Sequence, residues 1–412
     1  MSAVRVRAAT ASDLDRLVEI HATSFPDARG PEQRRRQLTQ PPLGSLADLR
    51  VAEDATGIVG HAVLFALGVG LGGRDVPAGG IASLGVAPES RGRGVASALL
   101  AGLERELSAR GTPLALLYPF REGFYARRGW APTSPFVRLE LGVDALARPD
   151  APGRSASQWA AVALDGGHLG ELAALYESAS RAAAGRVART PACWERQLAD
   201  ERRHWLGVRD AEGRLAGYAA VRYEAAEPHA RTTLVVDELV ARDRDAGWGV
   251  VERLHAQRDQ VDDVRLTLPL GDPWLHAFHD APGTRRGTAE LEHPMGRLAA
   301  GPMVRLVDAA AALAARAYAC DGALVLEVVE GAARERLRLV VEAGLARVER
   351  VGEGAAGEAA IEVDRAPLAS VVAAGVLPST AAALGSLRGS PEAIALADAL
   401  FAGPRWLCLD PF

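Results

Sequence analysis

The spacing of apolar side chains divides the N-terminal third of the chain into strands and helices. Alternating or short continuous apolar runs, typical of strands, lie at residues 4–9, 58–67, 81–86 and 114–118. Apolar positions recur at helical spacing in residues 14–20, 99–107 and 124–129. A capping box at 10–13 marks the first helix start, and the glycine-rich residues 70–80 are expected to join the second and third strands. This order predicts an α/β domain built on a mixed sheet.

The middle of the chain repeats this plan in outline, and the last part departs from it. The middle has a predicted helix and then strands, at residues 167–181, 203–208, 215–223 and 233–240. The last part has a predicted helix, three strands and two further helices, at residues 304–318, 323–329, 337–342, 346–351, 368–374 and 391–402. Separate blocks of strands and helices predict an α+β domain with an antiparallel sheet and helices on one face. We place the domains at residues 1–150, 151–300 and 301–412. The first boundary lies where residues 147–155 are rich in Pro, Gly and Ala, and the second lies where the pattern of elements changes.

The composition of the chain argues against several classes of protein. A formal net charge of -5 and scattered arginines argue against a nucleic-acid partner. The three cysteines, Cys193, Cys320 and Cys408, are far apart in sequence, which argues against a disulfide framework or a metal site. The first residues lack the features of a signal peptide, and no apolar run is long enough to cross a bilayer. We therefore expect a cytoplasmic protein with no membrane partner and no metal.

The turn between the 81–86 strand and the 99–107 helix has the composition of a diphosphate cradle. Backbone N–H groups at a helix start are unpaired and favour anions, and Gly92 and Gly94 let the backbone approach a ligand closely. Arg91 and Arg93 add charge, and Ala96 is small. The predicted cofactor-binding residues here are Leu84, Gly85, Val86, Arg91, Gly92, Arg93, Gly94, Val95, Ala96 and Ser97. The alternative is a turn whose glycines serve backbone conformation alone.

The middle segment lacks this composition at the corresponding place. Aligning residues 240–241 with 86–87 sets Asp245 against Arg91 and Trp248 against Gly94. An acid and an indole at those positions would repel a diphosphate and block its approach. We therefore predict a second domain of the same fold without a cofactor site.

Two motifs resemble those of the GNAT superfamily of N-acetyltransferases: Arg91-x-x-Gly94-x-Ala96 and Phe124-Tyr125-x-Arg127-x-Gly129-Trp130. An acetyltransferase domain, a degenerate copy and a last domain similar to sterol carrier protein together resemble the Eis acetyltransferases. Residues 303–308 and 396–401 match that family's last domain as well. The resemblance implies acetyl-CoA as co-substrate and assembly as hexamers. It also assigns Phe120 and Arg121 to the cofactor site, although the family usually has a small polar residue and an acid there.

Acetyl transfer to an amine requires a general base and a proton for the leaving thiolate. Tyr125 is the predicted proton donor, because a phenol has a pKa near that of a thiol and the family gives this role to the tyrosine of the same motif. The alternative is that Tyr125 only packs beneath the cofactor. The Eis resemblance offers the α-carboxylate of Phe412 as the base, and Asp27 is the alternative in the first domain. No nucleophilic Cys or Ser lies in the motifs, so we expect direct attack in a ternary complex.

The predicted function is acetyl transfer to a primary amine, and the acceptor stays open. Aminoglycosides, polyamines, small amine metabolites and protein lysines all present the same reacting atom. Two alternatives remain: a lipid- or apolar-ligand-binding protein that uses the last domain, and an N-acyltransferase that uses a longer acyl-CoA. The cradle in residues 91–97 favours the enzyme.

Overall fold

The computed structural model describes residues 4–41, 43–147, 159–225, 227, 231–278, 294–352, 359–410 and 412. The chain folds into two compact units, and each is described by itself. The first comprises Met1–Thr133, Pro302–Gly403 and Asp410–Phe412, and the second comprises Ser134–Gly301 and Pro404–Leu409. No helix among the described residues combines the length and the apolar character needed to span a membrane.

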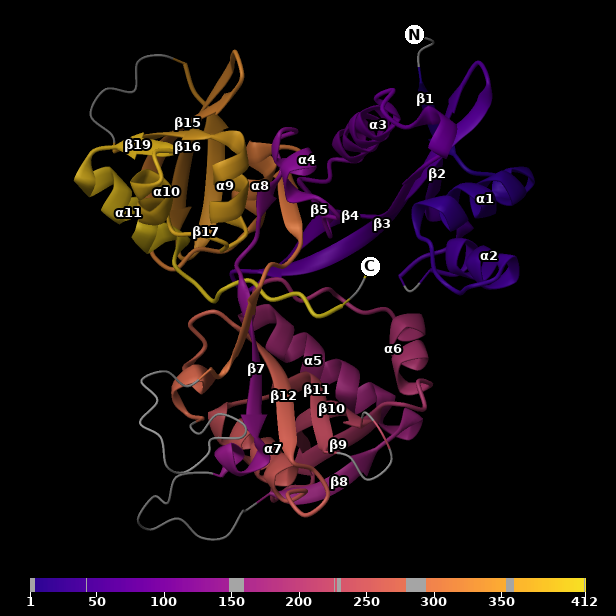
Figure 1. Ribbon diagram of the computed structural model, residues 1–412. Helices are drawn as coiled ribbons and strands as arrows, with labels where there is room; N and C mark the ends of the chain where they lie inside the picture. Colours follow the sequence, from indigo (N-terminus) through magenta and orange to yellow (C-terminus); the bar gives the residue numbers. More distant parts are fainter. Residues whose placement is uncertain are drawn as a thin grey trace. The chain divides into compact units, whose positions relative to one another are not determined.

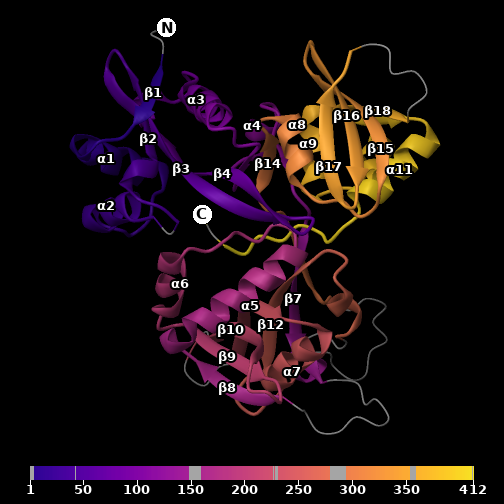
Figure 2. The same ribbon diagram turned by 180° about the vertical axis from the view of Figure 1, so that it is seen from behind.

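The first unit contains a seven-stranded sheet in the order β1-β2-β3-β4-β5-β14-β6. These strands are β1 (Arg5–Ala8), β2 (Leu49–Asp54), β3 (Gly57–Leu71), β4 (Arg74–Val86), β5 (Leu114–Leu117), β14 (Met303–Leu306) and β6 (Ala131–Pro132). The helices are α1 (Leu14–Ser24), α2 (Pro31–Thr39), α3 (Val95–Ala109) and α4 (Glu122–Ala126). Figures 1 and 2 show α3 on the opposite side of the β3–β4 ribbon from α1 and α2. The sheet is therefore covered on both faces.

Within the glycine-rich residues 70–80, residues 70–71 and 74–80 are strand residues, which corrects the expectation of a connecting stretch. β3 and β4 form one long hairpin whose turn is Gly72 and Gly73, at φ +62° and +95°. Paired glycines suit such a tight turn because they adopt positive φ without a steric penalty. Gly79 serves packing instead: a Cβ there would lie 2.4 Å from Leu107 of α3.

Two strands pair in a different sheet from that of the domain that precedes them in sequence. β7 (Phe136–Gly142) follows the first domain in sequence but pairs with β12 and β13 of the second sheet. β14 follows the second domain but pairs with β5 and β6 of the first sheet. The division therefore falls at Thr133, whereas the sequence pointed to a boundary near residue 150. Residues 148–155 of the predicted linker lie outside the described residues.

β14 also corrects the helix predicted at 304–318. Helical spacing was misleading here because residues 303–306 lie between β5 and β6 and are stabilised by pairing with these two strands, which are distant in sequence. The helix α8 (Ala309–Ala315) starts only after Asp308, whose side chain accepts a hydrogen bond from the backbone of Ala311.

The second unit has a sheet of the same plan, in the order β13-β7-β12-β11-β10-β9-β8. Its remaining strands are β8 (Ala160–Leu164), β9 (His204–Arg209), β10 (Leu215–Ala225), β11 (Thr232–Ala241), β12 (Asp263–Pro269) and β13 (Gly296–Ala299). Its helices are α5 (Leu169–Ala182), α6 (Pro191–Leu198) and α7 (Arg244–His255). β11 and β12 are parallel, as β4 and β5 are in the first sheet.

A five-stranded sheet in the order β17-β16-β15-β18-β19 completes the first unit. Its strands are β15 (Gly322–Glu330), β16 (Ala333–Glu342), β17 (Leu345–Arg350), β18 (Ala360–Asp364) and β19 (Leu387–Gly389). Its helices, besides α8, are α9 (Arg365–Val372), α10 (Pro378–Ala383) and α11 (Pro391–Phe401). β15 and β18 are parallel, so the sheet is mixed where an antiparallel one was expected. The difference arises because β18 returns beside β15 instead of forming a hairpin with β17.

Candidate active site

The first sheet opens where β5 ends. β4 and β5 pair in parallel from Ala78–Leu114 to Ile81–Leu117, and β4 then continues alone on that side to Val86. The β3–β4 register slips over the same stretch and leaves Ser83 and Leu84 without a partner in the ladder. Ser83 has φ +47°, an uncommon conformation for a residue with a side chain. Such bulges redirect the strand and are frequent beside functional sites.

A buried histidine pair lies next to this bulge and explains Gly85. A Cβ on Gly85 would lie 2.9 Å from both Nε2 of His61 and the hydroxyl of Ser24. The rings of His21 and His61 stack with centroids 5.7 Å apart. Burial lowers the pKa of His21 to about 4 and that of His61 to about 3, so both rings are neutral at pH 7. The strand bulge is therefore supported by polar but uncharged side chains.

The predicted cradle is an uncapped helix start. Gly94 is the N-cap of α3 at φ +84°, and Gly92 has φ +74°. No side chain caps α3, and a Cβ on either glycine would meet no atom within 4 Å. The glycines are thus required by backbone conformation, and the space outside them is open. An uncapped helix start with open space beside it fits a diphosphate group.

Three arginines supply charge around the cradle. Arg91 donates hydrogen bonds to the carbonyls of Thr23 (2.8 Å) and Val86 (3.3 Å). Arg93 pairs with Asp54 at 3.3 Å. Sequence reasoning missed the third, Arg128, which donates to the hydroxyl of Ser97 from Nε (3.0 Å) and from Nη2 (2.6 Å).

Arg128 also lies 3.8 Å above the ring of Phe124. It therefore links the helix of the tyrosine motif to the first turn of α3. Its place between Arg127 and Gly129 of that motif was the available signal.

Tyr125 lies on the α3 side of the first sheet. It is 3% exposed and belongs to a buried cluster with Ile81 of β4 and Leu100 of α3. Its ring contacts Phe124 and Trp130 edge to face. Burial raises the pKa of Tyr125 to about 12, so the phenol holds its proton at neutral pH.

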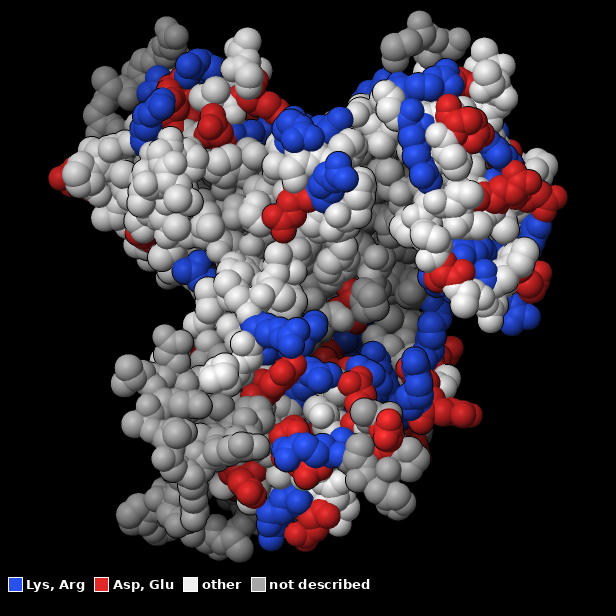
Figure 3. Space-filling view, in the orientation of Figure 1, with Lys and Arg blue, Asp and Glu red and all other residues white. Residues whose placement is uncertain are grey.

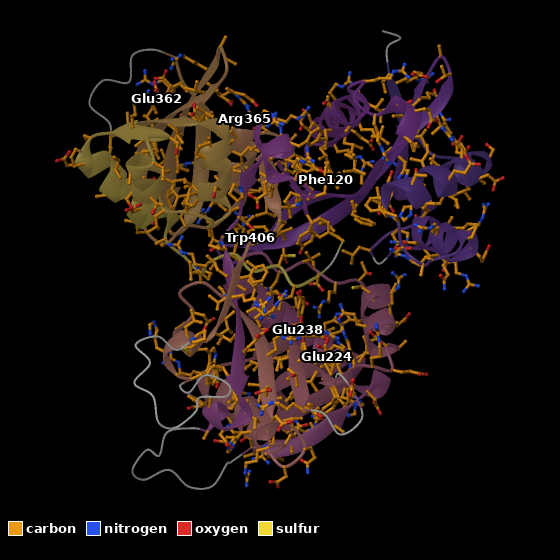
Figure 4. All side chains as sticks on the ribbon, viewed as in Figure 1. Phe120, Glu224, Glu238, Glu362, Arg365 and Trp406 are labelled. Carbon is orange, nitrogen blue, oxygen red and sulfur yellow. The ribbon has the colours of Figure 1, made fainter. Side chains whose placement is uncertain are left out.

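The two residues before α4 are exposed. Phe120 is 71% exposed and lies edge to face with Tyr125 at 5.6 Å, and Figure 4 shows it on the segment that follows β5. Arg121 is the N-cap of α4, and its side chain does not cap the helix.

Phe412 lies on the other face of β4. Its ring is 5.1 Å from the ring of Tyr118, and a Cβ on Gly80 would lie 3.0 Å from it. Successive strand residues point to opposite faces, so Gly80 and Phe412 are on the face opposite Gly79 and α3. Tyr125 and Phe412 therefore lie on opposite faces of the first sheet.

Asp27 is bound to two arginines. Its carboxylate accepts hydrogen bonds from Arg29 and, at 2.8 Å, from Nη2 of Arg34. The hydrogen bonds from Arg29 lower the pKa of Asp27 to about 2. A carboxylate whose pKa is lowered in this way is a weak base, so Asp27 is a poorer candidate for the general base than an unpaired carboxylate.

The described connection between β11 and α7 of the second domain does not form a comparable cradle. Only Arg242 and Asp243 lie between β11 and α7, whereas residues 87–94 separate β4 from α3. Asp243 is the N-cap, and its carboxylate accepts a hydrogen bond from the backbone of Ala246 at 2.8 Å. The counterpart of Gly94 is thus Asp243, and the alignment of Trp248 with Gly94 is corrected because Trp248 lies within α7. A carboxylate occupies the helix start where a diphosphate would bind.

Comparison with known proteins identifies each part of the chain. Residues 5–133 and 185–306 each match a family described as "Acetyltransferase (GNAT) domain", and residues 309–409 match "Sterol carrier protein domain". N-acetyltransferase Eis of Mycobacterium tuberculosis is 30% identical over 393 residues, which cover 92% of each chain. An uncharacterized N-acetyltransferase of Streptomyces avermitilis is 27% identical over 289 residues, 67% of each chain.

Solved structures share the whole fold. Eis1 from Mycobacterium abscessus superposes with a TM-score of 0.78 at 25% identity, over 99% of this chain and 100% of that one. A GCN5-related N-acetyltransferase from Anabaena variabilis gives a TM-score of 0.83 over 99% of this chain and 100% of that one, and at 22% identity it supports the fold alone.

The fold and the matched domains define an enzyme with two acetyltransferase domains followed by a sterol carrier protein domain. The chain belongs to the Eis-type N-acetyltransferases of the GNAT superfamily. Enzymes of this superfamily use acetyl-CoA as co-substrate.

Proposed function

We propose that the protein transfers acetyl from acetyl-CoA to a primary amine by direct attack in a ternary complex. The observation that carries the proposal is the uncapped start of α3 at Gly94. Along the chain, the β4 bulge precedes this helix start and Tyr125 follows it. The proposed contacts of the co-substrate are residues 84–86 of β4, residues 91–97 of the cradle, and Phe120 and Arg121 before α4.

Each group has a chemical task in this proposal. The N–H groups at the start of α3 hold the diphosphate, and Arg128 adds charge beside Ser97. Leu84 has no partner in the β3–β4 ladder, so its backbone N–H can donate a hydrogen bond to the thioester carbonyl and stabilise the charge that develops there. Tyr125 donates a proton to the departing thiolate.

The proposed base is the α-carboxylate of Phe412. An α-carboxyl group is ionised at neutral pH and can accept a proton from an ammonium, directly or through a water molecule. Its support is the position of the Phe412 ring on Tyr118, on the face of β4 opposite Tyr125. The amine would then enter on one face and the co-substrate on the other.

The acceptor is proposed only as a small or peptide primary amine. Arginines and acids are interspersed on the face shown in Figure 3, which supports a small acceptor in preference to a nucleic acid. Whether aminoglycosides are acceptors stays open. Hexamer formation, from the resemblance, and cytoplasmic location, from composition, stay predictions. Lipid binding by the last domain and use of a longer acyl-CoA stay the two alternatives.

The proposed function is tested by release of free thiol from acetyl-CoA with a panel of amines. Aminoglycosides, a polyamine, a small amine metabolite and a lysine peptide form the panel, with matched tertiary amines as controls. We expect acetylated product with at least one primary amine and none with the tertiary amines. Thiol release without acetylated product in any reaction would contradict amine acetylation.

We expect one coenzyme A to bind per chain, because Asp243 caps the helix start of the second domain. Isothermal titration calorimetry measures the stoichiometry. Gly94→Ala should weaken binding by about tenfold, because it strains the loop that presents the N–H groups. Gly111→Ala is the matched control, since Gly111 has φ +68°, equally open surroundings and a place at the other end of α3. Two sites per chain, or equal affinities for the two variants, would show that the cradle is misassigned.

A further inference from the structure

The second unit contains a cavity of about 570 Å³ that acetyl transfer does not use. It lies where β11 and β12 separate, because their register ends at Val236–Leu266 and residues beyond that point on both strands line the cavity. Trp248 of α7 and Trp274 form an aromatic part of its wall, with ring centroids 4.7 Å apart. The volume suits a small organic ligand.

The segment Pro404–Leu409 forms another part of the wall. The backbone of Leu407 donates a hydrogen bond to the carbonyl of Ala184 at 2.9 Å, and Trp406 is 1% exposed. Figure 4 labels Trp406 on this segment. Burial and backbone pairing hold the segment in place, so the cavity is a built feature of the unit.

The ligand cannot be held as acetyl-CoA is held in the first domain. The Asp243 carboxylate already accepts the hydrogen bond at the start of α7, and it would repel a diphosphate. The cavity thus keeps the position of a GNAT cofactor site without its diphosphate anchor. A ligand of different chemistry is required.

The charge of that ligand follows from Arg186, which lines the cavity. Its Nη1 is buried and has no hydrogen-bond partner among the described residues, and its Nη2 donates only a long bond of 3.5 Å to the carbonyl of Leu239. The carboxylate of Glu238, also in the wall, accepts hydrogen bonds from Arg189 and, at 2.6 Å, from the hydroxyl of Tyr218. In the described part of the chain, no carboxylate lies within ion-pair distance of Arg186, although the charge of Arg186 acts over a longer distance on the carboxylate of Glu238. A buried guanidinium nitrogen without a partner is costly unless an anion satisfies it.

We propose that this cavity binds a small anion with an aromatic body, of the class of aromatic carboxylic acids. The ring lies beside Trp248 and Trp274, and the anionic group accepts hydrogen bonds from Arg186. Aromatic walls favour a flat apolar body, and a guanidinium favours a carboxylate or sulfonate. This site is independent of the acetyl-transfer proposal.

The test uses the full chain and anilinonaphthalene sulfonate, an aromatic anion whose fluorescence rises in apolar surroundings. We expect one binding event per chain that persists with saturating coenzyme A, because the cofactor site is in the first domain. Arg186→Gln should weaken binding by about tenfold or more, through loss of a charge-assisted hydrogen bond. Neutral phenylnaphthylamine should bind wild type and Arg186→Gln equally.

Three further variants make the result decisive. Arg209→Gln removes an arginine that pairs with Glu171 at 2.8 Å and does not line the cavity, so it should leave binding of the sulfonate unchanged. Arg186→Lys keeps the charge and should retain most of the affinity. Leu239→Trp adds bulk to the wall and should reduce binding of both probes.

Loss of the whole signal on adding coenzyme A, or equal sulfonate affinity in wild type and Arg186→Gln, overturns the proposal. If Arg186→Gln does not fold, sulfonate binding is compared between Arg186→Lys and Leu239→Trp. Unchanged sulfonate binding in Leu239→Trp then overturns the proposal.

Discussion

Tyr125→Phe is expected to lower turnover by about a hundredfold or more while leaving the affinity for acetyl-CoA little changed. General acids contribute about 10² to 10⁴ in rate. Burial raises the pKa of the phenol to about 12, which keeps the proton available but widens the gap to a thiol near 8.5. We therefore expect an effect at the lower end of that range. Initial rates at saturating amine and calorimetric titration of the co-substrate measure the two quantities.

The matched control is Tyr176→Phe. Tyr176 is as buried as Tyr125, at 3% exposed, and lies in the second domain, where its hydroxyl donates to the carbonyl of Val187 at 2.9 Å. This variant should lose some stability through the unsatisfied carbonyl and keep normal turnover. Because phenylalanine retains the ring contacts with Phe124 and Trp130, a near-normal rate for Tyr125→Phe would assign Tyr125 to packing alone.

Removing the charge of Phe412 should depress acetyl transfer by about tenfold to a hundredfold, with coenzyme A binding largely intact. The ring packs on Tyr118 and over Gly80, whereas the cradle is made by residues 91–97 on other elements. Deletion of Phe412 removes both ring and charge from this place, and two added glycines displace the charge. Transfer rate and co-substrate affinity are measured separately for each form.

A C-terminal amide on Phe412, made by protein ligation, separates the two contributions. It keeps the ring and removes only the charge, so the amide should be nearly as slow as the deletion. Phe412→Leu keeps the carboxylate on a smaller anchor and should fall between wild type and deletion. Full activity in the amide and in the extended form would eliminate the carboxylate as base, and a water-assisted proton transfer would replace it.

Local chemistry made much of the candidate site predictable. Gly92 and Gly94 adopt positive φ, which a side chain disfavours, so their place before a helical run already pointed to a special turn. The burial of Tyr125, the bond from Arg128 to Ser97 and the arginine partners of Asp27 were not predictable in the same way. Each depends on residues that are distant in sequence and meet only when the elements pack.

The sequence by itself determined the helices with clear spacing, the capping box before α1, the cradle and the family motifs, because these depend on interactions within a few residues. Only the tertiary structure decided that β7 pairs in the second sheet and β14 in the first. It also decided that Phe412 lies on the face opposite Tyr125 and that a cavity opens between β11 and β12. Strand pairing and facing surfaces join segments far apart in the chain. A short run such as 303–306 therefore becomes a strand when a sheet offers it two partners, whatever its local spacing favours.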